Sequence, residues 1–480
     1  MSITRRNVFA NMLWRFAERT GAQIVAFIVQ IVLARIIAPE AYGTIALITV
    51  FTTILQVFVD SGLGNALIQK KDADNLDFST VFFTNVIFCI VLYIIMFFVS
   101  PMIARFYKNE ELVPLIRVLS LTVLISGVKN VQQAYVSRNL IFKKFFFSTL
   151  AGTIIAAIVG IYLAYSGYGV WALVAQQIVN LFIDTLVLWI TVKWRPEFAF
   201  SFERLKCLFN FGWKLLVSAI LDRTYTNLRQ LIIGKMYSSS DLAFYNRGEV
   251  LPNVVVSNIN TSIDSVLLPA MSSEQNNCEK VKNMTRRAIK TSTFIMAPLM
   301  MGFAACAPNL IKLLLTDKWL PCVPYLRICC ITYMFYPIHT ANLNAIQAMG
   351  RSDLFLKLEV VKKIMGFVLL LCTMWFGVMA MAYSLLLSSV LSQIINSWPN
   401  KKLLNYRYLE QLKDIFPTII IAILMGIVVV LIDLIPLEIY WFRLLLQIFA
   451  GVIIYIFFAK LTRNDSFEYI FTLVKNKVRK

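Results

Sequence analysis

Two segments of the chain place arginine and amide side chains on single helical faces, a pattern suited to binding phosphate. Near the N-terminus these residues recur about every four positions, and in 221–230 two neighbouring polar faces run along one helix. A guanidinium is planar, stays charged and bonds phosphate through two parallel N–H groups. We therefore predict that both segments bind a phosphate-bearing substrate. The predicted binding residues are Arg15, Arg19, Gln23, Arg223, Asn227, Arg229 and Gln230.

Three carboxylates in the same regions are candidate sites for a coupling ion or a proton. Asp222 adjoins the arginine-rich segment, while Asp60 and Asp264 lie near the ends of two apolar stretches. Ionisable groups inside a membrane mark ion pathways and proton relays. Alternatives stay open. Instead of binding an ion, Asp222 or Asp264 would neutralise a neighbouring arginine. Asp60 and Asp264 would alternatively pair with basic loop residues. Arg15 and Arg19, instead of binding substrate, would extend their side chains to the membrane surface.

The composition requires membrane-spanning helices to position these residues. The 480 residues are 59% hydrophobic and 15% charged, whereas soluble proteins have about 25% charged residues. The apolar residues form continuous blocks of about 20, the length of a spanning helix, and do not alternate as barrel strands do. We predict an all-α integral membrane protein with about fourteen transmembrane helices. The predicted spans are 13–37, 42–64, 78–101, 112–135, 146–166, 168–192, 211–234, 248–270, 289–314, 322–346, 355–375, 377–397, 415–433 and 440–459.

The basic residues predict how these helices are oriented. With the N-terminus in the cytoplasm, most of the 46 Lys and Arg residues fall in cytoplasmic loops, as the positive-inside rule requires. We predict a multi-pass protein of the cytoplasmic (inner) membrane with both termini cytoplasmic. The net charge of +20 is explained by the basic residues that fix this topology and that contact anionic membrane lipids. Nucleic acid is therefore not an expected partner.

A weak internal repeat relates the first twelve predicted helices. Six helices separate the two copies, so the copies have the same orientation, as in transporters whose substrate lies between parallel repeats near the membrane midplane. We predict an N-terminal lobe at 1–200, a C-terminal lobe at 201–400, and two additional helices with a basic cytoplasmic tail at 401–480. The matched segments are 33–35 with 233–235, 60–66 with 264–270, 138–144 with 351–357, and 168–173 with 376–381.

No sequence motif indicates catalysis, a cofactor or a metal. A P-loop, a glycine-rich nucleotide motif and a His/Cys metal spacing are all missing from the sequence. The predicted external loops are too short for the catalytic domain of a polymerase or a polytopic glycosyltransferase. We therefore expect a transporter without cofactors, driven by an ion gradient or by downstream use of its substrate.

Four short motifs are similar to those of polysaccharide exporters. Residues 33–43 read LARIIAPEAYG, close to the family signature LARxLxPexyG, and 60–69, 167–174 and 350–354 carry the other three. Together, from the first helix to about residue 397, they resemble the lipopolysaccharide/teichuronic-acid/O-antigen (Wzx-type) exporter branch of the multidrug/oligosaccharidyl-lipid/polysaccharide (MOP) flippase superfamily.

This resemblance implies both a fold and a function. The fold would be two six-helix lobes in a V shape around a cationic cavity, with family arginines matching Arg15/Arg19 and Arg223/Arg229 by region. The function would be flipping of undecaprenyl-pyrophosphate-linked oligosaccharide by alternating access, with glycosyltransferases or a polymerase of the same pathway as partners. Two alternatives stay open: an ion-coupled multidrug exporter, for which Glu18 and Asp222 are the only candidate carboxylates, and a lipid II flippase.

Overall fold

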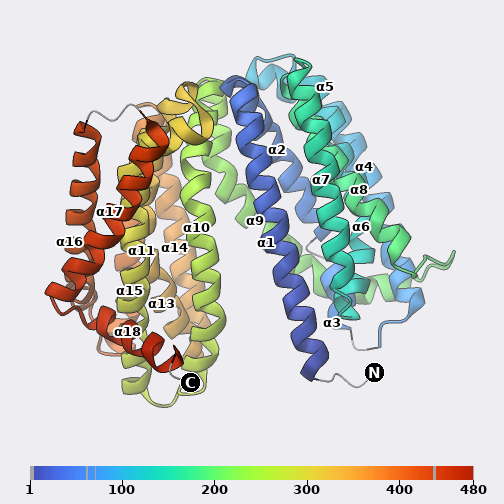
Figure 1. The fold of residues 1–480 in the computed structure, drawn as a ribbon. Helices are drawn as coiled ribbons and strands as arrows, with labels where there is room; N and C mark the ends of the chain where they lie inside the picture. Colours follow the sequence, from blue (N-terminus) through green and yellow to red (C-terminus); the bar gives the residue numbers. More distant parts are fainter. Residues whose placement is uncertain (1–4, 61–62, 71, 436–438, 479–480) are drawn as a thin grey trace. The chain divides into compact units, whose positions relative to one another are not determined.

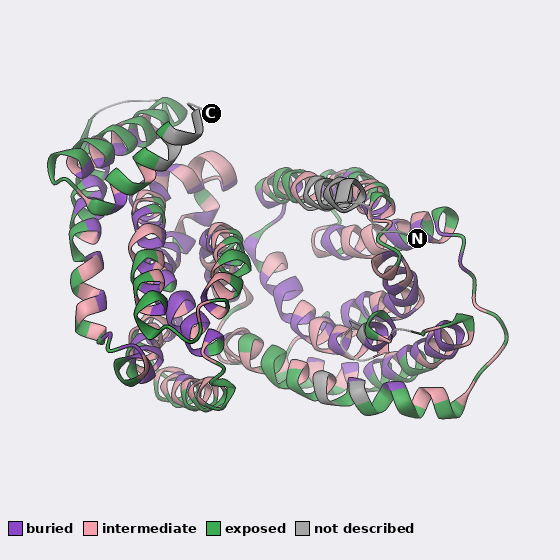
Figure 2. Cartoon of the chain, turned by 90° about the horizontal axis from the view of Figure 1, so that it is seen from below, coloured by how far each residue is buried: buried purple, intermediate pink, exposed green. Residues whose placement is uncertain are grey.

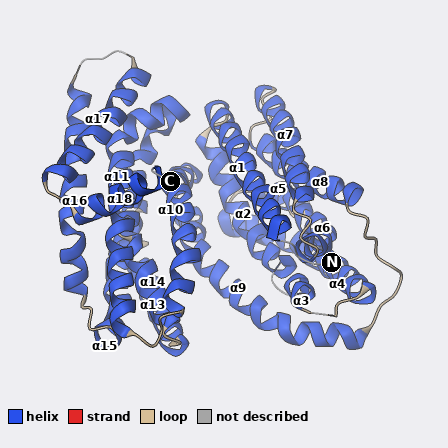
Figure 3. Ribbon diagram, turned by 60° about the horizontal axis from the view of Figure 1, so that its bottom comes forward, coloured by secondary structure: helices blue, strands red, loops and turns tan. Residues whose placement is uncertain are grey.

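The computed structural model describes residues 5–60, 63–70, 72–435 and 439–478, and all regular structure in these ranges is helical (Figures 1 and 3). Ten of the described helices are long and apolar enough to cross a membrane. The chain divides into two compact units, Met1–Ala243 and Phe244–Lys480. The predicted all-α, multi-pass membrane architecture is confirmed.

The first unit contains nine helices within its described residues, coloured blue to green in Figure 1. Most predicted spans in this region coincide with one helix. The span 112–135 is divided between α5 and α6 at Ser120, and 42–64 extends past the end of α2 at Asp60 into the start of α3. The helices are α1 (Arg5–Ile36), α2 (Pro39–Asp60), α3 (Leu63–Gln69), α4 (Asn75–Tyr107), α5 (Leu112–Leu119), α6 (Leu121–Arg138), α7 (Lys143–Tyr165), α8 (Val170–Thr191) and α9 (Phe202–Met236).

The second unit contains the remaining helices and two short 3-10 turns. Here the predicted span 322–346 is divided between α12 and α13 at Phe335. The elements are α10 (Ser239–Ser272, which begins at the end of the first unit), α11 (Cys278–Leu315), η1 (Asp317–Cys322), α12 (Val323–Met334), α13 (Tyr336–Ala348), α14 (Ser352–Thr373), α15 (Val378–Leu403), α16 (Tyr408–Leu431), η2 (Ile432–Leu434), α17 (Tyr440–Leu461) and α18 (Asp465–Val478).

Many large apolar side chains are exposed along the helices, as expected for surfaces that meet lipid. On α4 alone, Ile90, Ile94 and Phe98 are exposed, while Cys89 and Leu92 on other faces of the same helix are buried. Exposed and buried residues alternate around the helices throughout the chain (Figure 2). In water such apolar patches would drive aggregation, whereas in a bilayer they are the surface that contacts lipid.

Helix α9 packs against α2, α3 and α4 within the first unit. Its first turn is held to the start of α4, because Arg204 bonds Asp74 at 2.5 Å and lies 3.2 Å from Asp77. The Arg204 hydrogen bond lowers the pKa of Asp74 to about 2, so this carboxylate stays charged under all ordinary conditions. The repeat assigned α9 to the C-terminal lobe, and the lobe boundary at residue 200 stays a prediction.

Two glycines at equivalent positions of the repeat support the internal duplication. Gly169 precedes α8 with φ +52°, and Gly377 precedes α15 with φ +98°. Positive φ values are readily adopted by glycine and rarely by other residues. The matched segments 168–173 and 376–381 therefore both begin a helix after a glycine with positive φ.

The signature segment 33–43 has a structural role at the end of α9. Glu40 accepts a hydrogen bond from Ser240 Oγ at 2.7 Å. Next to it, a Cβ atom on Gly43 would lie only 1.7 Å from the backbone oxygen of Ser239. Glycine at this position therefore allows α2 to approach the turn between α9 and α10 directly.

We expect Gly43→Ala to destabilise the protein, because the added methyl group would overlap backbone that cannot rotate away. Overpacking of this kind costs about 1–3 kcal/mol or more, which should appear as a lower melting temperature of the detergent-purified protein. The matched control is Gly21→Ala in α1, where no atom lies within 4 Å of the new Cβ. Equal melting temperatures for the two variants would contradict this role of Gly43.

Candidate functional site

The polar segment 221–230 lies in the C-terminal half of α9, a helix of 35 residues. Asp222, Arg223 and Thr226 are exposed, and Arg229 and Gln230 are half-buried. This half of the helix therefore has a polar, partly exposed surface that includes two guanidinium groups.

Hydrogen bonds within α9 hold the smaller polar side chains of this segment against the helix. Asn227 donates from Nδ2 to the Arg223 carbonyl at 2.8 Å, and Thr226 donates to the Asp222 carbonyl at 3.0 Å. Such back-bonding satisfies the amide and hydroxyl donors without a ligand.

The charged residues of this segment restrict the environment in which this surface of α9 can lie within the membrane. An arginine at the centre of a bilayer costs about 2.5–3.5 kcal/mol on insertion scales, so such residues face water or protein. Arg223 is exposed, so its surroundings in the membrane must be aqueous or a polar ligand. A guanidinium in that setting is suited to bind phosphate through paired N–H donors.

Several predicted site residues cannot be compared with the structure. The side chains of Arg15, Arg19 and Asp60 lie outside the described residues, although their backbones are in α1 and α2. Gln23 is described and is exposed on α1. The roles predicted for these four residues stay predictions.

Asp264, the third candidate carboxylate, is exposed on α10 and accepts a hydrogen bond from Asn344 Nδ2 at 2.6 Å. An amide partner leaves the carboxylate charge in place, whereas a lysine or arginine partner would neutralise it. The role of Asp264 as a coupling-ion or proton site stays a prediction.

A second polar surface on α10 was not identified from the sequence. Asn253, Ser257, Thr261 and Asp264 are all exposed and recur at spacings of three or four, so they share one side of the helix. Hydroxyl and amide groups can both donate and accept, which suits the hydroxyls of a sugar. The signal in the sequence was the low hydropathy of span 248–270, which contains Asn253, Asn258, Asn260 and Asp264.

A buried ion pair lies inside the first unit, apart from these surfaces. Lys129 on α6 and Asp184 on α8 approach to 2.5 Å, with side-chain exposures of 13% and 10%. Gly152 on α7 brings that helix close to this pair, since a Cβ there would lie 3.2 Å from the Asp184 Cβ. Within the described residues, no cluster of His, Cys, Asp and Glu could hold a metal ion.

Comparison with known proteins identifies the family. Residues 32–324, more than half of the chain, match the family model described as polysaccharide biosynthesis protein. The chain is 26% identical to the teichuronic acid biosynthesis protein TuaB of Bacillus subtilis (strain 168), covering 78% of this chain and 79% of that protein. It is 24% identical to the lipopolysaccharide biosynthesis protein WzxC of Escherichia coli (strain K12), with 83% of each chain covered.

Solved structures show the same fold. The lipid II flippase MurJ in an inward closed conformation matches with a TM-score of 0.76 at 15% identity, covering 95% of this chain and 99% of MurJ. A multidrug resistance MATE family transporter of the MOP superfamily matches with a TM-score of 0.61 at 15% identity, covering 80% of this chain and 94% of the transporter. These structures show the likeness in fold. The family model and the relatives confirm the predicted family resemblance, and the chain belongs to the polysaccharide biosynthesis protein family.

Proposed function

We propose that this protein flips a lipid-linked oligosaccharide, carried on undecaprenyl pyrophosphate, across the cytoplasmic membrane by alternating access. The observation that carries the proposal is the polar surface of α9, where exposed Arg223 and half-buried Arg229 lie in a membrane protein. The names of the relatives give the substrate class: teichuronic acid for TuaB, lipopolysaccharide for WzxC, and succinoglycan transport for ExoT of Rhizobium meliloti (strain 1021).

In this proposal the arginines bind the diphosphate that links carrier and sugar. Arg223 and Arg229 carry two guanidinium groups, six residues apart on one helix. Their two positive charges match the charges of the two phosphate groups, and their N–H groups can donate to the phosphate oxygens. Asn227 and Gln230 add amide groups between and beside them. Arg15, Arg19 and Gln23 on α1 would contribute a second basic surface.

The sugar would be recognised by the uncharged polar surface of α10. Asn253, Ser257 and Thr261 present amide and hydroxyl groups that hydrogen-bond sugar hydroxyls without a strong charge preference. A moderately specific surface of this type suits a substrate whose sugar sequence differs between pathways. Asp264, Asp222 and Asp60 are the proposed sites for a coupling cation or proton.

The proposed topology places both termini in the cytoplasm, since most basic loops would then be cytoplasmic. The oligosaccharide is assembled on its carrier by glycosyltransferases before flipping and is joined to a polymer afterwards. Enzymes of those two steps are therefore the proposed protein partners.

The proposal is tested by measuring the surface polysaccharide and the lipid-linked oligosaccharide of a strain that lacks this protein. We expect surface polysaccharide to disappear and oligosaccharide linked to undecaprenyl diphosphate to accumulate, because assembly continues while translocation stops. Normal surface polysaccharide with new sensitivity to cationic drugs would instead indicate a multidrug exporter. Accumulation of lipid II with unchanged surface polysaccharide would indicate a lipid II flippase.

A further inference from the structure

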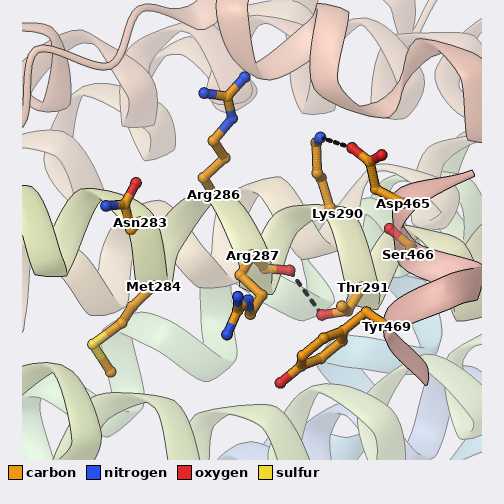
Figure 4. A pocket seen from close by; sticks show the side chains of 9 residues that line it. All are labelled: Asn283, Met284, Arg286, Arg287, Lys290, Thr291, Asp465, Ser466 and Tyr469. Atoms are coloured by element: carbon orange, nitrogen blue, oxygen red, sulfur yellow. Dashed lines mark hydrogen bonds and ion pairs between the residues drawn. The ribbon is translucent and has the colours of Figure 1, made fainter. Parts of the chain in front are cut away.

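A cavity of ≈ 470 Å³ lies between α11 and the C-terminal helix α18, both in the second unit (Figure 4). We call it the α11–α18 pocket. Its lining has three basic side chains and one acidic one, so its charge is positive. The lining residues are Asn283, Met284, Arg286, Arg287, Lys290, Thr291, Asp465, Ser466 and Tyr469.

The basic side chains are held in place by partners around the pocket. Arg286 bonds Asp414 of α16 at 2.6 Å, and Lys290 bonds Asp465 of α18 at 2.9 Å. The Arg287 guanidinium carbon lies 4.6 Å from the centre of the Tyr469 ring. A guanidinium stacked on a ring still presents N–H donors at its edge, so Arg287 can bond an anion without giving up this contact.

The ion pair that crosses the pocket is weak enough for an anion to replace it. Asp465 is 80% exposed, and exposed pairs of this kind contribute little to stability because water screens them. A phosphate in the pocket can accept from the Arg287 guanidinium, or from the Lys290 ammonium in place of Asp465, forming short charge-assisted bonds. Asp414, the buried acid, bonds Arg286 at 2.6 Å and also lies 3.7 Å from Lys290, so both basic side chains keep a carboxylate partner when an anion replaces Asp465.

The sequence around the pocket places it at a membrane surface. Basic residues of α11 end at Lys290, and the next charged residue is Lys312. Likewise, α16 has no charge between Asp414 and Asp433, and α17 ends beside Lys460. Three neighbouring helices thus change from charged to apolar at one level, the level of lipid headgroups.

Helix α18 has the properties of a helix that lies in this interface. It is short, it follows directly on α17, and Phe467 packs on Phe294 of α11. Phe471 stacks on Phe467 and is 58% exposed, so it offers an apolar ring to the bilayer. Amphipathic helices in the headgroup region bury such rings in the acyl boundary.

We propose that the α11–α18 pocket binds the phosphate of an anionic phospholipid, whose acyl chains continue into the adjacent bilayer. Positive charge, interfacial depth and an amphipathic helix beside the pocket are together the features that suit a lipid headgroup, whereas a soluble anion needs only the charge. The pocket shares no residue with the α9 and α10 surfaces, and the proposed lipid binding does not depend on the transported substrate.

The test uses the full-length protein purified in a neutral detergent and native mass spectrometry to count bound lipids. With phosphatidylglycerol and phosphatidylcholine of the same chain length, we expect wild type to retain phosphatidylglycerol selectively. Arg287→Gln should weaken that retention about tenfold. Arg351→Gln, which removes an exposed arginine paired with Asp353 outside the pocket, should have no effect.

Asn283→Glu provides a second variant, because it adds a negative charge to the pocket while keeping every basic residue. It too should reduce phosphatidylglycerol binding. Equal retention by wild type, Arg287→Gln and Asn283→Glu would overturn the proposal. Complete displacement of the lipid by millimolar inorganic phosphate would also overturn it, because the site would then bind soluble phosphate.

Discussion

Replacing Arg223 and Arg229 together with alanine should reduce export of surface polysaccharide about 100-fold, while the protein remains in the membrane. A hydrogen bond to a charged group contributes about 1.5–3 kcal/mol, so losing two arginine–phosphate contacts costs at least about 3 kcal/mol. Each 1.4 kcal/mol changes an equilibrium about tenfold. The measurement is the amount of surface polysaccharide in a deletion strain that expresses the variant, with protein abundance determined in the same membranes.

Lysine substitutions at these two positions distinguish the effect of the positive charge from that of the planar guanidinium geometry. The double variant Arg223→Lys/Arg229→Lys keeps the charge but loses the planar pair of N–H groups, so we expect partial export. The matched control is Arg105→Ala, which removes an exposed arginine at the end of α4 in the same unit. Export by the double alanine variant equal to that of the Arg105→Ala control would show that these arginines do not bind the substrate.

Breaking the Lys129–Asp184 pair should destabilise the protein more than any surface change. Removing one partner of a buried ion pair leaves the other charge unpaired, at a cost of about 3–5 kcal/mol. Lys129→Met should therefore lower the melting temperature in detergent and the amount of protein in the membrane. Replacing both residues, as in Lys129→Met/Asp184→Leu, should restore much of that stability because no buried charge remains.

The double variant also distinguishes a structural pair from a functional one. Stable protein with normal export would show that the pair serves packing of α6 against α8. Stable protein without export would show that the charges take part in transport. A Lys129→Met variant as stable as wild type would contradict the burial of the pair.

The sequence predicted the long helices well because their cause is local. A block of about 20 apolar residues can satisfy its backbone in a bilayer only as a helix, and α4, α8 and α16 follow directly from such blocks. The breaks at Ser120 and Phe335 were not predicted. At Ser120 both flanking helices remain apolar, so no local pattern marks the break. At Phe335 the unused signal is Pro337 in the first turn of α13, because proline is favoured at the start of a helix and disrupts its interior.

The candidate site was only partly predictable, for a related reason. Charge identifies Arg223 and Arg229, since an arginine inside an apolar span is costly and therefore conspicuous. Hydroxyl and amide residues such as Ser257 and Thr261 are tolerated in any membrane helix by bonding back to their own backbone. Only the structure distinguished exposed polar residues on α10 from polar residues buried in packing, such as Asn342 and Asn400.

Helix α18 shows a third limit of what the sequence alone could predict. The segment was predicted as part of a basic cytoplasmic tail, because it is too short and too charged to span a membrane. Its helix is supported by the tertiary contact of Phe467 with Phe294, and the exposed pair of Lys290 with Asp465 adds a weaker one. Contacts between residues so far apart in the chain cannot be read from either segment alone.

The most direct test is translocation by the purified protein in liposomes. Lipid-linked oligosaccharide is incorporated into both leaflets, and an enzyme that cannot cross the membrane cleaves the sugar from outside. We predict that wild type makes the inner-leaflet pool accessible, whereas Arg223→Ala/Arg229→Ala leaves it protected. An inner-leaflet pool that stays protected with folded wild-type protein under an imposed proton or sodium gradient would contradict flipping as the function of this chain.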